Sequence, residues 1–201
     1  MSKKWLKVAL MVTAIATSTS IQVDAETVLF VPQDDRPVSL QYTVDTAKAA
    51  GMTVLTPPQN LISGKTYKGQ ADQIWNWVEQ NAGRADVMVL STDTLIYGGL
   101  VDSRKHNLPL STLEYRLKRI EALKANYKNT RIYGFGTVMR SPRASGGGTE
   151  PSYYADYGPT IFQIAALQDK LDAGTLTQAE TQKLMSLQAS VPVEYLQDWF
   201  S

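Results

Sequence analysis

The sequence predicts an α/β fold in which strands and helices alternate around a mainly parallel sheet. Four short runs of apolar and β-branched residues, typical of buried strands, are each followed by a segment with helical spacing of apolar side chains. The runs begin at Thr27, Met52, Val87 and Arg131. Right-handed crossovers of this kind make neighbouring strands parallel. The pattern fits a doubly wound sheet or part of a TIM-like barrel, and periodicity does not separate the two.

The first strand, Thr27–Val31, leads almost directly into the charged segment Asp34–Pro37. Proline is favoured in the first turn of a helix, and glycine is favoured just after its end. Pro37 and Gly51 therefore predict a helix between them. The second strand, 52–56, ends at two consecutive prolines, which cannot continue a ladder of hydrogen bonds.

The segment 69–82 is predicted to be a helix with one apolar face. That face comprises Ala71, Ile74, Trp75, Val78 and Ala82. Trp77 lies off the face, and packing at the edge of the sheet is favoured over stacking on a sugar because its neighbours are apolar. After the third strand, Gly98 and Gly99 permit a positive φ or a close approach of two backbones.

Two later helices are marked by capping boxes, in which a Ser or Thr before the helix pairs with a Glu three residues later. Ser111 and Glu114 predict the start of the first. Its expected buried face comprises Leu113, Leu117, Ile120, and Leu123 or Lys124. Thr177 and Glu180 predict the start of a helix over 178–189. We also expect a mobile loop over 141–148, a helix over 161–171 and a last helix that begins near Pro192.

The composition excludes several classes of function. Of the 201 residues, 43% are hydrophobic and 19% are charged, which is typical of globular proteins. The net charge of +1 gives no indication of a nucleic-acid partner. The sequence has no cysteine, which excludes disulfides, thiolate metal sites and cysteine nucleophiles.

The N-terminus has the pattern of a signal peptide. A basic region with three lysines precedes the apolar segment 8–16, which is too short to span a bilayer, and 23–25 resembles a cleavage site. We expect residues 1–25 to be removed and the α/β domain to comprise 26–201. This predicts an exported bacterial protein, periplasmic or secreted, with no stable membrane insertion after signal cleavage. The alternative is an uncleaved membrane anchor.

Charged residues stand at the C-terminal ends of three predicted strands. Asp34 and Asp35 follow the first strand, Asp93 the third and Arg140 the fourth. Because ligands bind at this edge in parallel α/β folds, the sequence predicts a site there. Two carboxylates a few ångströms apart suit glycoside hydrolysis, one as general acid and the other as nucleophile or base. The three aspartates are therefore the candidate catalytic residues.

The expected partner is a small-molecule or carbohydrate ligand. Arginine binds carboxylate and phosphate groups bidentately, and tyrosine rings could form the aromatic wall of a sugar site. The candidate substrate-binding residues are Arg36, Tyr97, Arg104, Arg140 and Tyr154.

Structural alternatives exist for these residues. Asp34 or Asp35 would cap the helix predicted from Pro37, and Arg36 would pair with Asp93. The tyrosines equally suit half-buried packing. Two other functions also remain open, a non-catalytic ligand-binding protein and a metal-dependent hydrolase.

No cofactor is predicted, although the aspartates offer oxygen ligands to a divalent cation. His106, the only histidine, lies in a polar segment and is interpreted as a surface residue. A multi-histidine zinc site is thereby excluded within this sequence.

Four motifs resemble a bacterial family, domain of unknown function 4127. They are Val-Pro-Gln-Asp-Asp-Arg-Pro at 31–37, Leu-Ser-Thr-Asp-Thr-Leu-Ile-Tyr-Gly-Gly-Leu-Val-Asp-Ser-Arg at 90–104, Val-Met-Arg at 138–140 and Tyr-Ala-Asp-Tyr-Gly at 154–158. The second is long and fairly specific, and the resemblance covers nearly all of the chain after the signal peptide. Members of the family are more than twice as long. Together with a helix start near the C-terminus that has no stop signal, this implies that the chain is the N-terminal part of a longer protein. The resemblance implies no particular reaction.

Overall fold

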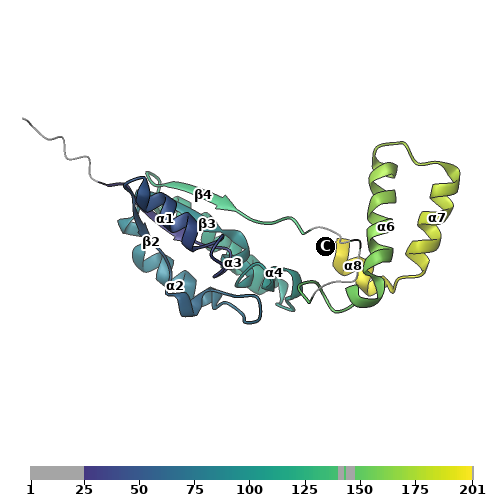
Figure 1. Ribbon diagram of the computed structural model, residues 1–201, viewed down its shortest axis with the longest axis horizontal. Coiled ribbons are helices and arrows are strands. Elements are labelled where there is room, and N and C mark those ends of the chain that lie inside the picture. Colours follow the sequence, from purple (N-terminus) through teal and green to yellow (C-terminus); the bar gives the residue numbers. More distant parts are fainter. Residues whose placement is uncertain (1–24, 140–142, 144–147, 201) are drawn as a thin grey trace, which may run out of the picture.

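The computed structural model describes residues 25–139, 143 and 148–200, and its centre is a sheet of four parallel strands. The strands are β1 (Thr27–Val31), β2 (Thr53–Leu55), β3 (Val87–Ser91) and β4 (Arg131–Phe135). The sheet has the order β2-β1-β3-β4 with β2 and β4 at its edges (Figure 1). The parallel α/β prediction is confirmed, and the described strands form an open sheet rather than a closed barrel.

Helices connect the strands and continue after the sheet. Between the strands lie α1 (Gln41–Ala49), α2 (Ala71–Asn81), α3 (Thr92–Tyr97), α4 (Asp102–Lys105) and α5 (Leu110–Asn126), with 3₁₀ turns η1 (Gln59–Leu61) and η2 (Ala82–Arg84). After β4 come α6 (Tyr154–Asp172), α7 (Gln178–Ala189) and α8 (Val193–Phe200). None of these helices is long and apolar enough to cross a membrane.

The strand order reverses direction at β1. The chain passes from β1 outward to β2 and then returns to β3 on the other side of β1, so that Val28 pairs with both Val54 and Val87. The connections that leave β1 and β3 therefore diverge at the carboxyl ends of these strands. In open α/β sheets such a switch point opens a crevice in which ligands bind.

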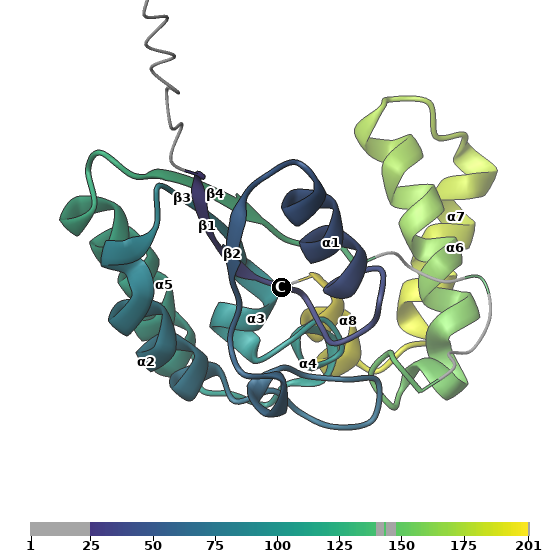
Figure 2. The same cartoon turned by 60° about the vertical axis from the view of Figure 1, so that its left-hand side comes forward.

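The main core lies between one face of the sheet and α2 and α5, while α1 lies on the other face (Figure 2). It comprises Leu29, Val31, Met88 and Leu90 of the strands, Ile74, Trp75, Val78 and Ala82 of the α2 segment, and Leu123 of α5, with Leu61, Ala85 and Leu95. The predicted apolar face of α2 is confirmed. The Trp75 indole N–H donates to the Leu95 carbonyl at 2.8 Å, so this large side chain is buried without an unpaired polar atom. Trp77 is partly buried against the same cluster, as predicted.

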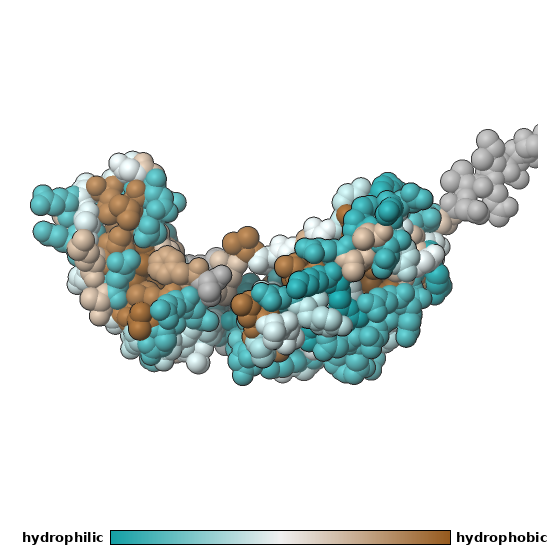
Figure 3. Space-filling model, turned by 180° about the vertical axis from the view of Figure 1, so that it is seen from behind, coloured by the Kyte–Doolittle hydropathy of each residue, from teal (hydrophilic) through white to brown (hydrophobic). Residues whose placement is uncertain are grey.

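Helices α6, α7 and α8 have a second, separate core. Tyr154, Ile161, Ile164 and Leu167 of α6 pack with Leu184 of α7 and with Val191. The helices stand beside the sheet (Figure 1), and the space-filling view shows a hollow on the surface between the two parts (Figure 3). The Thr177 capping box is confirmed, since Glu180 N–H donates to Thr177 Oγ1 at 3.3 Å and Thr177 N–H donates to Glu180 Oε2 at 3.0 Å. Helix α6 begins at Tyr154, earlier than predicted.

Two other predicted helix starts are also wrong. Helix α1 begins at Gln41 rather than at Pro37, because Arg36 first closes a turn in which its carbonyl accepts from Ser39 N–H at 2.9 Å. Helix α5 begins at Leu110, after Pro109 with an extended ψ of 144°. Ser111 therefore already lies in the first turn, and no side chain caps this helix.

The buried face of α5 also differs from the prediction. Leu123 is buried and Ile120 packs against the core, but Leu117 is 48% exposed. Arg116 is buried instead, because its guanidinium forms a bidentate pair with Asp72 of α2 and donates to the Ile96 carbonyl at 2.7 Å. The spacing of apolar residues predicts a leucine on the buried face of α5. Arg116 is buried there instead, because its long side chain reaches these hydrogen-bond partners. Residues 1–24 and most of the loop 141–148 lie outside the described residues, so the signal peptide and the mobile loop stay predictions.

Candidate functional site

The segments that follow β1, β3 and β4 meet at the carboxyl edge of the sheet. Ser91 ends β3 and caps α3, accepting from Thr94 N–H at 3.3 Å. The Thr94 hydroxyl donates to the Pro32 carbonyl at 2.7 Å. This hydrogen bond links the start of α3 to the segment after β1. Gly98 ends α3 with a φ of 106°, which is one of the two alternatives predicted for the Gly98–Gly99 pair. The short helix thus presents Asp93 at the switch point.

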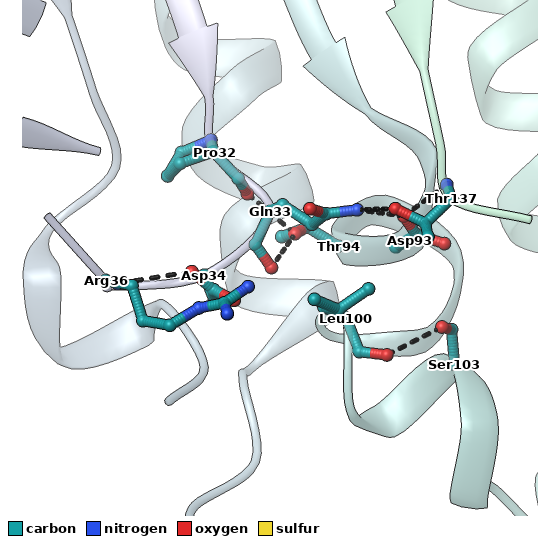
Figure 4. Close-up of polar contacts among 9 residues, drawn as sticks. All are labelled: Pro32, Gln33, Asp34, Arg36, Asp93, Thr94, Leu100, Ser103 and Thr137. Atoms are coloured by element: carbon teal, nitrogen blue, oxygen red, sulfur yellow. Dashed lines mark hydrogen bonds and ion pairs between the residues drawn. The ribbon is translucent and has the colours of Figure 1, made fainter. Parts of the chain in front are cut away.

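Asp93 is the centre of the hydrogen bonds at this edge (Figure 4). The side chain is buried, and its Oδ2 accepts from Gln33 Nε2 at 2.8 Å and from Thr137 N–H at 3.0 Å. Gln33 follows β1 and Thr137 follows β4, so one oxygen of Asp93 receives donors from both neighbouring strands. The carboxylate is thereby fixed in position, as a reacting group requires.

Asp34 is paired with Arg36 of its own loop. Arg36 donates from Nε to Asp34 Oδ2 at 2.8 Å and from its backbone N–H to Oδ1 at 3.2 Å, and its NH2 lies 2.7 Å from Oδ2. The side-chain hydrogen bond to Asp34 raises the pKa of the Arg36 guanidinium. The alternative pairing of Arg36 with Asp93 is therefore wrong, and Figure 4 shows Asp34 and Arg36 as a group apart from Asp93.

Asp35 has a different set of contacts. Its carboxylate accepts from the Tyr67 hydroxyl, and its backbone N–H donates to the Ser63 carbonyl at 2.9 Å. The hydrogen bond raises the pKa of Tyr67. Neither Asp34 nor Asp35 caps α1, whose first residue has no side-chain cap.

A groove of about 1050 Å³ lies beside Asp93, between the sheet and α8. Its polar lining comprises Thr92, Asp93, Ser103, Arg104, Glu114, Thr137 and Asp198, together with Tyr97 and His106. Its apolar lining includes Ile96, Leu110, Leu113, Leu117, Val138, Met139 and Trp199. A groove of this size suits a small-molecule ligand.

Tyr97 and His106 are stacked, with ring centroids 4.7 Å apart and planes 30° from parallel. Burial lowers the pKa of His106, and the Asp198 charge acts in the opposite direction. The two rings also line a smaller cavity of about 140 Å³ with Asp102. Burial raises the pKa of Asp102, although its carboxylate accepts from Gly69 N–H at 3.2 Å.

The groove brings together three of the residues predicted from the sequence, Asp93, Tyr97 and Arg104. Asp34, Asp35 and Arg36 lie in the loop after β1 and do not line it. Tyr154 is buried in the core of α6–α8, where burial raises its pKa. Arg140 lies outside the described residues.

Sequence reasoning missed Gln33, which donates to Asp93, and several residues that line the groove. Gln33 and Thr137 follow the ends of strands, near predicted site residues. Their position at the edge of the sheet could therefore have identified them as site residues. Glu114 was assigned to a helix cap. Asp198 and Trp199 come from a distant helix, and nothing local in the sequence connects them with Asp93.

The three aspartates do not converge on one point. Among the described residues, no group of three or more His, Asp or Glu side chains is arranged to hold a metal ion. Asp34, Asp35 and Asp93 each have different hydrogen-bond partners.

Comparison with known proteins identifies a family. The model of a family described as "Protein of unknown function (DUF4127)" matches residues 28–201. No curated protein and no solved structure matches the chain. The chain therefore belongs to the DUF4127 family.

Proposed function

We propose that the protein binds a carbohydrate in the groove beside Asp93 and hydrolyses it. The observation that supports this most directly is the Asp93 carboxylate, buried at the edge of the groove and held through Oδ2 by Gln33 and Thr137. A fixed carboxylate at the switch point of a parallel sheet occupies the place where α/β proteins bind their ligands. It suits the role of nucleophile, or of base toward water.

Hydrolysis of a glycosidic bond needs a second carboxyl group on the other side of the bond. Glu114 of α5 lines the same groove and is exposed. We assign it the role of general acid in place of Asp34 and Asp35, which are engaged with Arg36 and Tyr67.

Other residues of the groove would bind the sugar. Arg104 offers a planar fork of donors to hydroxyl or carboxylate groups. The stacked rings of Tyr97 and His106 offer an aromatic surface to the C–H face of a sugar ring. Export to the periplasm or cell exterior, which the N-terminal pattern predicts, would bring the protein into contact with such substrates.

The test is turnover of a panel of aryl glycosides and soluble polysaccharides by the wild-type protein and two variants. Asp93→Asn is expected to lower kcat by roughly a thousandfold while ligand binding persists, because the amide keeps an acceptor for Thr137 N–H. Asp34→Asn is the matched control, since this buried aspartate does not line the groove, and it should retain turnover in the folded protein. Equal activity of Asp93→Asn and the wild type would contradict the proposed reaction.

A non-catalytic carbohydrate-binding protein is the second candidate. The observation that favours it is the stacked Tyr97–His106 pair, which suits binding without any chemistry. If no glycan is turned over, but a sugar raises the melting temperature of both the wild type and Asp93→Asn, binding is the better description.

A further inference from the structure

We propose that the ligand of the groove is a sugar that carries an alkyl or acyl chain, and that this chain lies along the leucines of α5. The inference rests on the proposed carbohydrate ligand and specifies its chemical class. The observation behind it is that part of the groove is lined by apolar side chains, which a sugar alone would not contact favourably.

Helix α5 has more apolar surface than the sheet covers. Ile120 and Leu123 contact the main core. Leu110, Leu113 and Leu117 recur at spacings of three and four residues, which places them on one side of the helix, and all three line the groove. Leu110 is 69% exposed and Leu117 is 48% exposed. A row of exposed leucines at this spacing indicates an apolar binding partner.

The other sides of the groove extend this apolar surface. Val138 and Met139, which follow β4, line the groove, and Val138 is 95% exposed. Trp199 of α8 lines it as well. Apolar side chains also gather around the hollow between the two parts of the molecule in the space-filling view (Figure 3).

The apolar wall and the polar groups belong to one continuous groove of about 1050 Å³. Aliphatic side chains offer no hydrogen bonds to sugar hydroxyls, so a polyol lying against leucine would lose hydrogen bonds to water without replacement. A methylene chain gains from the same contact. An amphiphilic ligand makes favourable contacts with both parts of the groove. Its sugar lies beside Asp93 and Arg104, and its chain lies against Leu113 and Leu117.

The experiment measures the affinity of the purified full chain for methyl, butyl, hexyl and octyl β-D-thioglucosides by titration calorimetry, below their micelle concentrations. The sulfur linkage resists hydrolysis, so binding is measured independently of the proposed reaction. We expect the affinity to rise about threefold for each methylene that reaches the leucines. An affinity that does not depend on chain length, or no binding of any member, would overturn the proposal.

Leu117→Gln is the diagnostic variant, because glutamine keeps a helix propensity close to that of leucine. It should weaken octyl thioglucoside roughly tenfold and leave the methyl compound unchanged. Leu171→Gln is the matched control, since Leu171 on α6 is also 48% exposed and does not line the groove. Equal losses in the two variants would overturn the proposal. So would a lower molar mass of Leu117→Gln in light scattering, which would identify the leucines as an interface between copies of the chain.

The outcomes also separate this inference from the proposed hydrolysis. Affinity that depends on chain length, together with no turnover of any oxygen-linked glycoside, supports the amphiphilic ligand and contradicts the reaction. Turnover of short glycosides without a chain-length effect supports the reaction and overturns the amphiphilic ligand.

Discussion

Gln33 and Asp93 are 60 residues apart in the sequence, and the Gln33 side-chain amide donates to Asp93 Oδ2 at 2.8 Å. The same oxygen accepts from Thr137 N–H at 3.0 Å. One carboxylate therefore joins the segments that follow β1, β3 and β4. The proposed reacting group is also a structural link at the edge of the sheet.

Gln33→Met tests this link. The variant retains an unbranched side chain but removes the donor, and the loss of a hydrogen bond to a charged group should lower the free energy of unfolding by about 2 kcal/mol. Urea denaturation measures the effect. Gln73→Met is the control, because Gln73 lies on the exposed side of α2 with only Gln70 as a side-chain partner, and it should be nearly neutral.

Arg36→Met should destabilise the protein, because among the described residues it leaves the buried Asp34 carboxylate with the backbone N–H of residue 36 as its one donor. The Arg36 side chain is half exposed, and solvent screening reduces the expected loss to about 1–2 kcal/mol. A double-mutant cycle with Asp34→Asn isolates the interaction. Additive effects of the two substitutions would show that the ion pair contributes nothing.

Gly69→Ala should disrupt the contact between the segment before α2 and the end of α3. A Cβ at position 69 would overlap the Gly98 carbonyl oxygen, and neither backbone can move easily because Gly69 N–H also donates to Asp102. We expect a loss of about 1–3 kcal/mol, measured by thermal denaturation. Gly83→Ala is the matched control, since its nearest neighbour would be the Tyr127 ring at 4.0 Å, and it should change stability by less than about 1 kcal/mol.

Asp102→Asn should change how stability depends on pH. Burial raises the pKa of Asp102 above its ordinary value, so the folded protein holds this proton more tightly than the unfolded chain does. The stability that Asp102 contributes is therefore fully present below its unfolded pKa and is lost as the pH rises through its raised folded pKa.

The asparagine variant has no carboxyl group to ionise and can still accept from Gly69 N–H. Its melting temperature should exceed that of the wild type at neutral pH, and the difference should disappear in acid. Melting curves at several values between about pH 3 and about pH 8 measure this. A difference that grows toward low pH would contradict the assigned direction.

Features that depend on neighbours within three or four residues were predictable. The apolar face of α2 follows from helical spacing, and the Thr177–Glu180 capping box follows from two residues three positions apart. The positive φ of Gly51 after α1 likewise reflects glycine's lack of a Cβ. The alternation of strands and helices gave the parallel sheet and placed Asp93 at its carboxyl edge.

The local pattern at Ser111 and Glu114 failed because α5 starts two residues earlier, with Pro109 before its first residue, Leu110. The predicted burial of Leu117 failed because the neighbouring Arg116 is the residue that is buried, where it pairs with Asp72 on another helix. The second outcome depends on a partner 44 residues away, which hydrophobic spacing does not contain.

Length, patterning and turn residues thus specified the elements and the edge at which a site would form. Asp34 pairs with Arg36 within its own loop, whereas the long-range fold brings Asp93 to Gln33 and Thr137 beside the groove. It also placed Trp199 of α8 in the groove that the leucines of α5 line. Strand pairing and helix packing join residues that are far apart in the sequence, and the partner of a polar side chain is settled only when those surfaces meet.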